Sequence, residues 1–111
     1  MTTSTNLPGP ASVASAAETI APYIRHTPLL RAEVDGRPLV LKLEHLQRSG
    51  SFKLRGALTA LLRGDRPDHV VTASGGNHGL GVATAAALLG LPATVYVPET
   101  VPATKARRIE E

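Results

Sequence analysis

One stretch of the chain, residues 70–89, constrains the possible folds more than any other. It begins with the short run Val-Val-Thr-Ala, continues with the six residues Ser-Gly-Gly-Asn-His-Gly, and ends in an alanine-rich segment that is apolar on all sides. β-Branched residues favour a strand, and a segment without a polar face favours a buried helix. This order predicts a strand, a tight glycine-rich loop and a covering helix, which is the building unit of an open α/β sheet.

The rest of the chain continues the alternation of helices and strands. Apolar spacing and turn residues predict, in chain order, a helix over 12–22, a strand over 39–44, a helix over 51–64, a strand over 93–97 and a helix from about residue 102 onward. Strands that alternate with helices pair in parallel through right-handed crossovers. We therefore expect an α/β fold with an open, mainly parallel sheet and flanking helices.

Local signals refine these elements. Ser15 and Glu18 have the spacing of a capping box for the first helix. Leucines at every second position of 39–44 predict a strand that packs one face, and the Asp-Gly pair at 35–36 indicates a turn before it. Ser51 is a good N-cap for the next helix, and Gly64 ends that helix.

Composition excludes several kinds of site. The chain has no cysteine, which rules out disulfides, thiolate metal ligands and cysteine nucleophiles, and its four histidines lack metal-binding spacing, so we expect no metal. The net charge is +3, but the basic residues are dispersed and aromatic residues make up only 3% of the chain. Nucleic-acid binding needs a basic patch or a stacking platform, and we expect neither.

Location and the N-terminus follow from the same composition. No run approaches the ~20 apolar residues that cross a bilayer, so we expect no membrane partner. The missing cysteines and the absence of a signal-peptide pattern favour a cytoplasmic location. Residues 1–11 are rich in Thr, Ser, Pro and Gly and are predicted to form a disordered tail, which leaves 12–111 as the folded part.

The glycine-rich loop, residues 74–79, is the first candidate binding site. In an open α/β sheet, ligands bind where a loop leaves the carboxyl end of a strand and starts a helix, because the helix offers free N–H groups there. The loop spacing matches neither a dinucleotide fingerprint nor a P-loop. It therefore fits an anion site formed by Ser74, Asn77 and backbone amides, and it equally fits a plain turn whose glycines permit helix–strand packing.

Lys53 is the second candidate. It lies just after the N-cap candidate Ser51, where its positive charge opposes the helix dipole at a cost of about 0.3–1 kcal/mol. The same field favours the neutral amine, which is the form that a Schiff-base lysine must reach. An exposed lysine extending into water is the alternative interpretation.

Two segments together resemble a known family. Residues 51–57, Ser-Phe-Lys-Leu-Arg-Gly-Ala, and residues 72–79, Thr-Ala-Ser-Gly-Gly-Asn-His-Gly, are similar to the serine/threonine dehydratase group of fold-type II pyridoxal-phosphate enzymes. Supporting similarities are His-Thr-Pro-Leu at 26–29, the Leu-Lys-Leu-Glu strand at 41–44 with Ser-Gly at 49–50, and Val-Pro at 97–98 with Lys105. The resemblance covers the chain from about residue 12 onward.

The resemblance implies a role for each site residue. Lys53 would carry the cofactor pyridoxal 5'-phosphate and act as the catalytic base. Asn77 would bind the oxygen on the cofactor ring, and Phe52 would shape the cofactor pocket. Substrate binding would fall to the loop, where the carboxylate of a small amino acid would contact the following residues: Ser74, Gly75, Gly76, Asn77 and His78.

The same resemblance implies an ammonia-lyase that converts L-serine or L-threonine to a 2-oxo acid and ammonia, and it allows a homo-oligomer for the full-length enzyme. The family's tetraglycine phosphate loop and its partner for the pyridine nitrogen lie downstream of the matching region. Residues 12–111 are thus expected to be a truncated N-terminal part of the catalytic domain, inactive alone. Alternatives are a racemase or a lyase for another hydroxy-amino acid. Gly75, where racemases of the group carry a serine, favours elimination.

Overall fold

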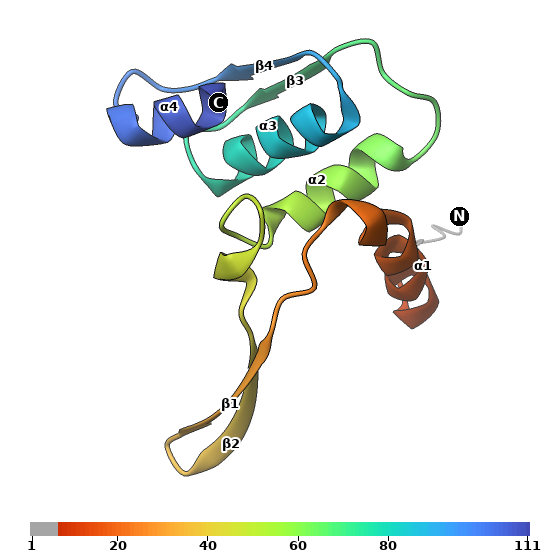
Figure 1. The fold of residues 1–111 in the computed structure, drawn as a ribbon, viewed down its shortest axis with the longest axis vertical. Helices are drawn as coiled ribbons and strands as arrows, with labels where there is room; N and C mark the ends of the chain where they lie inside the picture. Colours follow the sequence, from red (N-terminus) through yellow and green to blue (C-terminus); the bar gives the residue numbers. More distant parts are fainter. Residues whose placement is uncertain (1–6) are drawn as a thin grey trace, which may run out of the picture.

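The computed structural model describes residues 7–111, and it has an α/β fold (Figure 1). Four α-helices and four strands follow one another in the described part of the chain, with short 3-10 turns at Ala21–Tyr23 and Glu44–Leu46. In chain order the elements are α1 (Pro10–Ile20), β1 (Leu29–Val34), β2 (Arg37–Lys42), α2 (Lys53–Leu62), β3 (Val70–Ala73), α3 (Asn77–Leu89), β4 (Ala93–Tyr96) and α4 (Ala103–Glu110).

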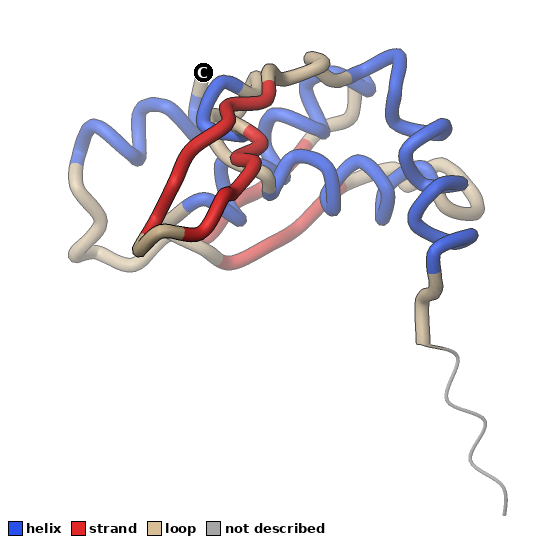
Figure 2. Tube along the Cα trace, turned by 90° about the horizontal axis from the view of Figure 1, so that it is seen from below, coloured by secondary structure: helices blue, strands red, loops and turns tan. Residues whose placement is uncertain are grey.

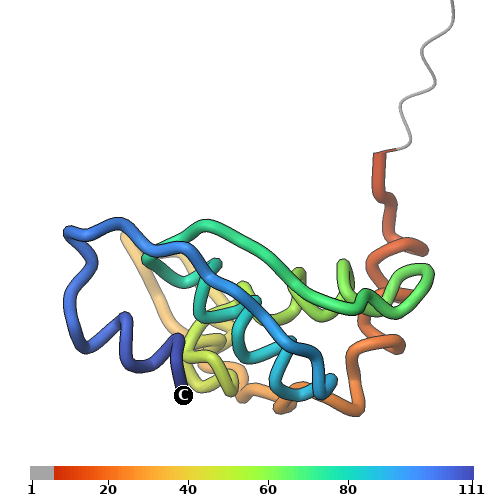
Figure 3. The backbone as a smooth tube through the Cα atoms, turned by 90° about the horizontal axis from the view of Figure 1, so that it is seen from above, coloured from red at the N-terminus to blue at the C-terminus, as the bar shows by residue number. Residues whose placement is uncertain are grey.

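Strands β3 and β4 form the predicted parallel pair, joined by α3. Val70 lies opposite Ala93 and Ala73 opposite Tyr96. The N–H of Ser74 still donates to the carbonyl of Tyr96 at 2.9 Å, so the pairing extends one residue beyond β3. Figure 3 shows the two strands running together across the helices. The predicted order of strand, glycine-rich loop and covering helix is confirmed.

The core lies where α2 and α3 pack on each other and on β3. Leu54 and Leu58 of α2 are completely buried, and so is Ala85 of α3. Apart from Ile20, the buried apolar residues are leucine, valine and alanine, because the chain has few aromatic side chains to fill an interior. The close helix contact this allows brings the start of α2 against α3.

Strands β1 and β2 form an antiparallel hairpin and not a part of the parallel sheet. Asp35 and Gly36 have φ angles of 50° and 73°, which suits a two-residue hairpin turn. Figure 1 shows this pair apart from β3–β4, projecting from the helices, and in Figure 2, seen from below, the hairpin lies in front of them. The predicted packed face of residues 39–44 is wrong for these residues: Leu39 is 41% and Leu41 is 42% exposed. A two-residue turn returns the strand on itself, whereas parallel pairing needs a long crossover.

The first helix begins earlier than predicted, at Pro10. Proline suits this position because its ring presets a helical φ angle. Ser15 therefore lies inside α1, where its carbonyl accepts the hydroxyl of Thr19 at 3.0 Å, and the predicted capping box is wrong. The predicted tail reaches no further than residue 9, and its residues 1–6 lie outside the described residues.

Two further findings concern residues 7–111 as a whole. None of their helices combines the length and apolarity that crossing a membrane requires. No group of three or more His, Asp or Glu side chains among them is arranged to hold a metal ion.

Candidate active site

Lys53 is the first residue of helix α2. The residue before it, Phe52, has no polar group to cap the helix. The Oγ of Ser51 instead accepts the N–H of Lys53 at 3.4 Å. Ser51 is buried, whereas Phe52 and Lys53 are exposed. The prediction of Ser51 as the N-cap is thus wrong by one residue, because Phe52 holds that position, and the side chain of Lys53 leaves the helix at its positive end.

A groove of about 410 Å³ lies between α2 and β3, beside Lys53. Apolar residues of α2 and β3 form most of its walls, and its polar side chains are those of Lys53, Thr72 and His78. None of these lining residues is acidic. The Nζ of Lys53 lies 5.4 Å from the centre of the Phe52 ring, a cation–π arrangement. The groove can therefore accept a flat or anionic molecule next to a primary amine.

The ring of His78 also belongs to this groove, which sequence reasoning did not predict. Its Nε2 lies 3.2 Å from the hydroxyl of Thr72 at the end of β3. The resemblance assigns the loop around His78 to a substrate carboxylate and says nothing of this side chain. The spacing could have indicated this contact. A tight loop separates the end of the strand from the start of the helix, so His78, six positions after Thr72, comes back beside it.

The glycine-rich loop ends in the N-terminus of α3, which begins at Asn77. The hydroxyl of Ser74 accepts the N–H of Gly76 at 3.2 Å and so closes the loop. Within the described residues, no acceptor is found for the N–H groups at the start of the helix, those of Asn77, His78 and Gly79. Free N–H groups at a helix N-terminus are suited to bind a carboxylate or phosphate.

The loop glycines have different reasons to be glycine. A Cβ on Gly79 would collide with the carbonyl oxygen of Ser74, and one on Gly75 would lie 2.9 Å from Cδ of Pro98. These two positions are explained by packing. A Cβ on Gly76 would meet nothing within 4 Å, so the backbone there is open to a ligand. Both interpretations of the loop, packing and binding, thus hold for different residues.

Asn77 lies away from the groove of Lys53. It lines a small pocket between α3 and α4, together with Gly76, Lys105 and Arg108. The side chain of Arg108 in α4 donates to the carbonyl of Ser49 at 3.5 Å. The structure brings Phe52, Lys53 and His78 into one groove, and the placing of Lys53 and Asn77 around a single ring stays a prediction.

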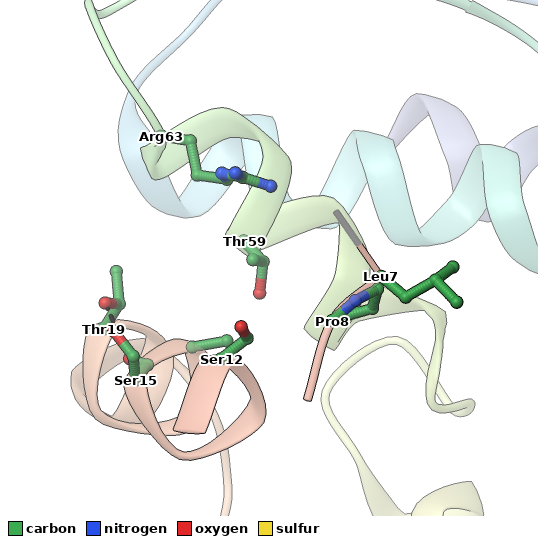
Figure 4. Close-up of a pocket in the computed structure, with 8 residues that line it drawn as sticks. Leu7, Pro8, Ser12, Ser15, Thr19, Thr59 and Arg63 are labelled. Atoms are coloured by element: carbon green, nitrogen blue, oxygen red, sulfur yellow. Dashed lines mark hydrogen bonds between the residues drawn. The ribbon is translucent and has the colours of Figure 1, made fainter. Parts of the chain in front are cut away.

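A larger hollow, of about 510 Å³, separates α1 from α2 but has no predicted site residue in its walls (Figure 4). Figure 4 shows Ser12, Ser15 and Thr19 of α1 facing Thr59 and Arg63. The hydroxyls of Thr19 and Thr59 are already donated to carbonyls of their own helices, at 3.0 and 2.8 Å. Size alone does not make this hollow the active site.

Comparison with known proteins gives one consistent result. The chain is 41% identical over 107 residues to a putative threonine dehydratase of Sinorhizobium fredii, and 42% identical over 106 residues to an L-threo-3-hydroxyaspartate ammonia-lyase of Pseudomonas. These matches cover 90% and 89% of this chain but 32% and 33% of the relatives. The chain thus spans about a third of the length of these curated relatives.

Solved structures agree. The structure of maize serine racemase matches with a TM-score of 0.81 and 36% identity, over 90% of this chain and 32% of the other. The family model described as "Pyridoxal-phosphate dependent enzyme" matches residues 20–111, which include the groove, the glycine-rich loop and α4. With the motifs at 51–57 and 72–79 in the predicted strand–loop–helix setting, the predicted family is confirmed, and the chain belongs to the pyridoxal-phosphate dependent enzymes.

Proposed function

We propose that this chain is the lysine-bearing part of an ammonia-lyase that converts L-serine or L-threonine to a 2-oxo acid and ammonia. The observation that carries the proposal is the placing of Lys53, an exposed amine at the start of α2 on a groove without acidic lining residues. The relatives named threonine dehydratase and hydroxyaspartate ammonia-lyase support a hydroxy-amino acid as substrate.

The residues present fit one end of the cofactor. An aldehyde needs an accessible amine, which Lys53 offers, and a flat ring needs an apolar wall, which α2 and β3 offer. Phe52 would flank the ring and Asn77 would hold its oxygen. The sequence has no run of four glycines, so the phosphate end finds no such loop among these residues. When bound, the cofactor supplies an electron sink for the carbanion formed at Cα.

The chain's own groups supply binding and proton transfer. The amine of Lys53 would hold the cofactor, and as a free amine it would remove the proton from Cα of the substrate. Ser74, Gly75, Gly76 and the free N–H groups of Asn77 and His78 bind the substrate carboxylate at the positive end of α3. The imidazole of His78, held beside Thr72, lies in the same groove as the amine.

Racemisation is the second candidate, because maize serine racemase is among the similar structures. A racemase needs a second acid or base on the opposite face of Cα. The position that would supply it is Gly75, which has no side chain, and a Cβ there would lie 2.9 Å from Pro98 and 3.1 Å from Val101. Packing against Pro98 and Val101 therefore favours the lyase.

The test is to trap the lysine chemically. The purified chain is treated with pyridoxal phosphate and borohydride, and the modified lysines are identified by peptide mapping. We expect Lys53 to be modified ahead of Lys42 and Lys105, and Lys53→Ala to lose the main adduct while Lys105→Ala keeps it. Equal modification of all three lysines would contradict the assignment of Lys53.

The same preparations are then assayed with L-serine, L-threonine and threo-3-hydroxyaspartate. Release of a 2-oxo acid that depends on Lys53 would assign the lyase and its substrate. Formation of the D-amino acid without a 2-oxo acid would assign the racemase. Absence of turnover together with equal modification of all three lysines would assign the remaining alternative, an inactive truncated chain that does not hold the cofactor.

A further inference from the structure

The side chain of Gln47 is buried and does not line the groove, and all its hydrogen-bonding capacity is used. It is 3% exposed. Its Oε1 accepts the N–H groups of Arg25 at 2.9 Å and Arg48 at 3.1 Å. Its Nε2 donates to the carbonyl of Arg25 at 3.0 Å and to Oε2 of Glu44 at 3.4 Å. The carboxamide thus binds both backbone groups of Arg25, as a neighbouring strand would, and we call this arrangement the Gln47 clamp.

A series of hydrogen bonds leads from the clamp to Lys53. The carbonyl of Gln47 accepts the N–H of Gly50 at 2.8 Å, and Gly50 has a φ of 79°, which closes a tight turn. The buried hydroxyl of Ser49 donates to the carbonyl of Ser51 at 3.2 Å. The Oγ of Ser51 then accepts the N–H of Lys53. Each step between the clamp and the start of α2 is therefore held by a hydrogen bond.

Glu44 braces the same segment from the other side. Its Oε2 accepts the hydroxyl of the buried Thr27 at 2.9 Å, besides the amide of Gln47. Its Oε1 is buried and lies 3.5 Å from Nη1 of Arg55, two residues beyond Lys53. The clamp and this ion pair hold the segment on both sides of Lys53.

We propose that Gln47 is a positioning residue for Lys53, fixing through the clamp the backbone from which the lysine side chain reaches into the groove. The inference deepens the proposed function and rests on it for the importance of the Lys53 amine. Removing the carboxamide would leave the part-buried N–H and carbonyl of Arg25 without their side-chain partner, so the turn at 47–50 would shift as water replaces the carboxamide. Lys53 would move with the turn, since Ser51 and Phe52 connect them directly.

The position of the lysine can be read without any cofactor. Its Nζ lies 5.4 Å from the centre of the Phe52 ring, so the ring current of Phe52 displaces the NMR signals of the Lys53 ε-methylene. A Phe52→Leu variant gives the undisplaced value. We expect Gln47→Ala to move the signals toward that value, and Arg48→Ala, which removes an exposed neighbouring side chain, to leave them unchanged. Wild-type signals in a folded Gln47→Ala protein would overturn the proposal.

Amide exchange separates positioning from general stability. In Gln47→Ala the amides of Gly50 and Arg55, at the turn and at the start of α2, should exchange about tenfold faster or more. The amide of Leu91, bonded to Ala86 at 2.8 Å at the far end of α3, should be unaffected. Equal acceleration at all three amides would mean that Gln47 only stabilises the fold, and would overturn the proposal.

Gln47→Glu keeps the inference testable if the alanine variant does not fold. An ionised glutamate still accepts the N–H of Arg25 but cannot donate to its carbonyl, and it lies beside Glu44. The charged groups around the new carboxyl are Glu44, Arg55, which pairs with Glu44, Arg25, which contacts Leu46, and Lys42, which contacts Thr27. The change in the Lys53 signals should therefore be complete at neutral pH. It should diminish as the pH falls to about 4, where the protonated carboxyl again donates to the carbonyl of Arg25. A defect that does not diminish would overturn the proposal.

These readouts separate the two proposals. If borohydride trapping shows no preference for Lys53, the proposed function fails, but the NMR signals and exchange rates still decide whether Gln47 sets the position of the lysine. If the Lys53 signals do not respond to Gln47, the positioning role fails while the trapping result stands.

Discussion

The structure contains two pairs of strands, and they differ in what covers them. In the β3–β4 pair, α3 crosses from one strand to the next, and with α2 it buries Val70 to 8% exposure. In the β1–β2 pair a two-residue turn makes the connection, and every residue except the half-buried Ala32 is exposed. The helix of a crossover connection packs on the strands that it joins, whereas the strands of a hairpin are buried only if another segment packs on them. The residues of the candidate site gather at the covered pair.

The exposed hairpin still has an apolar face. Leu30 lies opposite Leu41 and Ala32 opposite Leu39, so these four side chains share one side of the pair. The alternation that predicted a strand was correct, and within the described residues nothing packs on the face it produces. The comparison thus separates the tendency to form a strand from the burial of that strand. Substitutions in the two regions can test this separation.

The largest effect is expected in the covered region, from Leu58→Ala. Leu58 is completely buried between α2 and its neighbours, so the change removes buried methyl groups and leaves a cavity. Such changes lower the free energy of unfolding by about 2–5 kcal/mol. Denaturant unfolding followed by circular dichroism measures the loss. A loss below about 1 kcal/mol would show that the core at α2 is loosely packed.

Gly81→Ala should have the next largest effect, and it should reach Lys53. A Cβ on Gly81 would lie 3.0 Å from the carbonyl carbon of Lys53 and 3.1 Å from the nitrogen of Leu54. Backbone cannot move aside as a flexible side chain does, so we expect a loss of about 1–3 kcal/mol and a changed NMR signal of Lys53.

The matched control is Gly56→Ala, in the helix that faces Gly81. A Cβ at Gly56 meets nothing within 4 Å, and alanine is the better helix former by about 1 kcal/mol. We expect this variant to be as stable as the wild type or more so. If both variants lose stability equally, the close contact at Gly81 is not what limits that position.

Local chemistry explains how much could be predicted from the sequence. Residues 70–89 were predicted well because β-branched residues, glycines and alanines each favour one state there, and tertiary contacts agree with them. The hairpin was not predicted although its turn at Asp35 and Gly36 was, because the pairing of β1 with β2 depends on the positive φ angles of that turn. Strand pairing depends on two segments together, so the residue pattern of one segment does not predict its partner.

The site shows the same limit. Lys53 and the glycine-rich loop were predicted because a lysine at a helix start and three glycines in six residues are unusual locally. The ring of His78 in the groove and the Gln47 clamp were missed, because each depends on a contact with another segment. Gln47 binds a residue 22 positions earlier, and no spacing rule links the two.

Gly36→Ala should have a smaller and strictly local effect. Gly36 has a φ of 73°, which costs a residue with a side chain roughly 1 kcal/mol. The hairpin should therefore open more often, and amide exchange in β1 and β2 should accelerate. The amides of β3 and β4 should keep their rates, because no hydrogen bond in the described structure joins the two pairs. Acceleration in both pairs would show that the hairpin and the covered region unfold together.

The smallest effect is expected from Leu41→Ala, which repeats the chemistry of Leu58→Ala on the exposed face. Leu41 is 42% exposed and lies opposite Leu30 in the hairpin, so its truncation leaves no cavity in the interior. We expect the free energy of unfolding to change by no more than about 0.5 kcal/mol, as for other surface positions. Unfolding is measured at several protein concentrations, because cover supplied by a second copy would make the effect depend on concentration. A loss of unfolding free energy close to that of Leu58→Ala would show that the apolar face of the hairpin is covered in solution. The difference between the two strand pairs would then be a property of the single chain and not of the protein in solution.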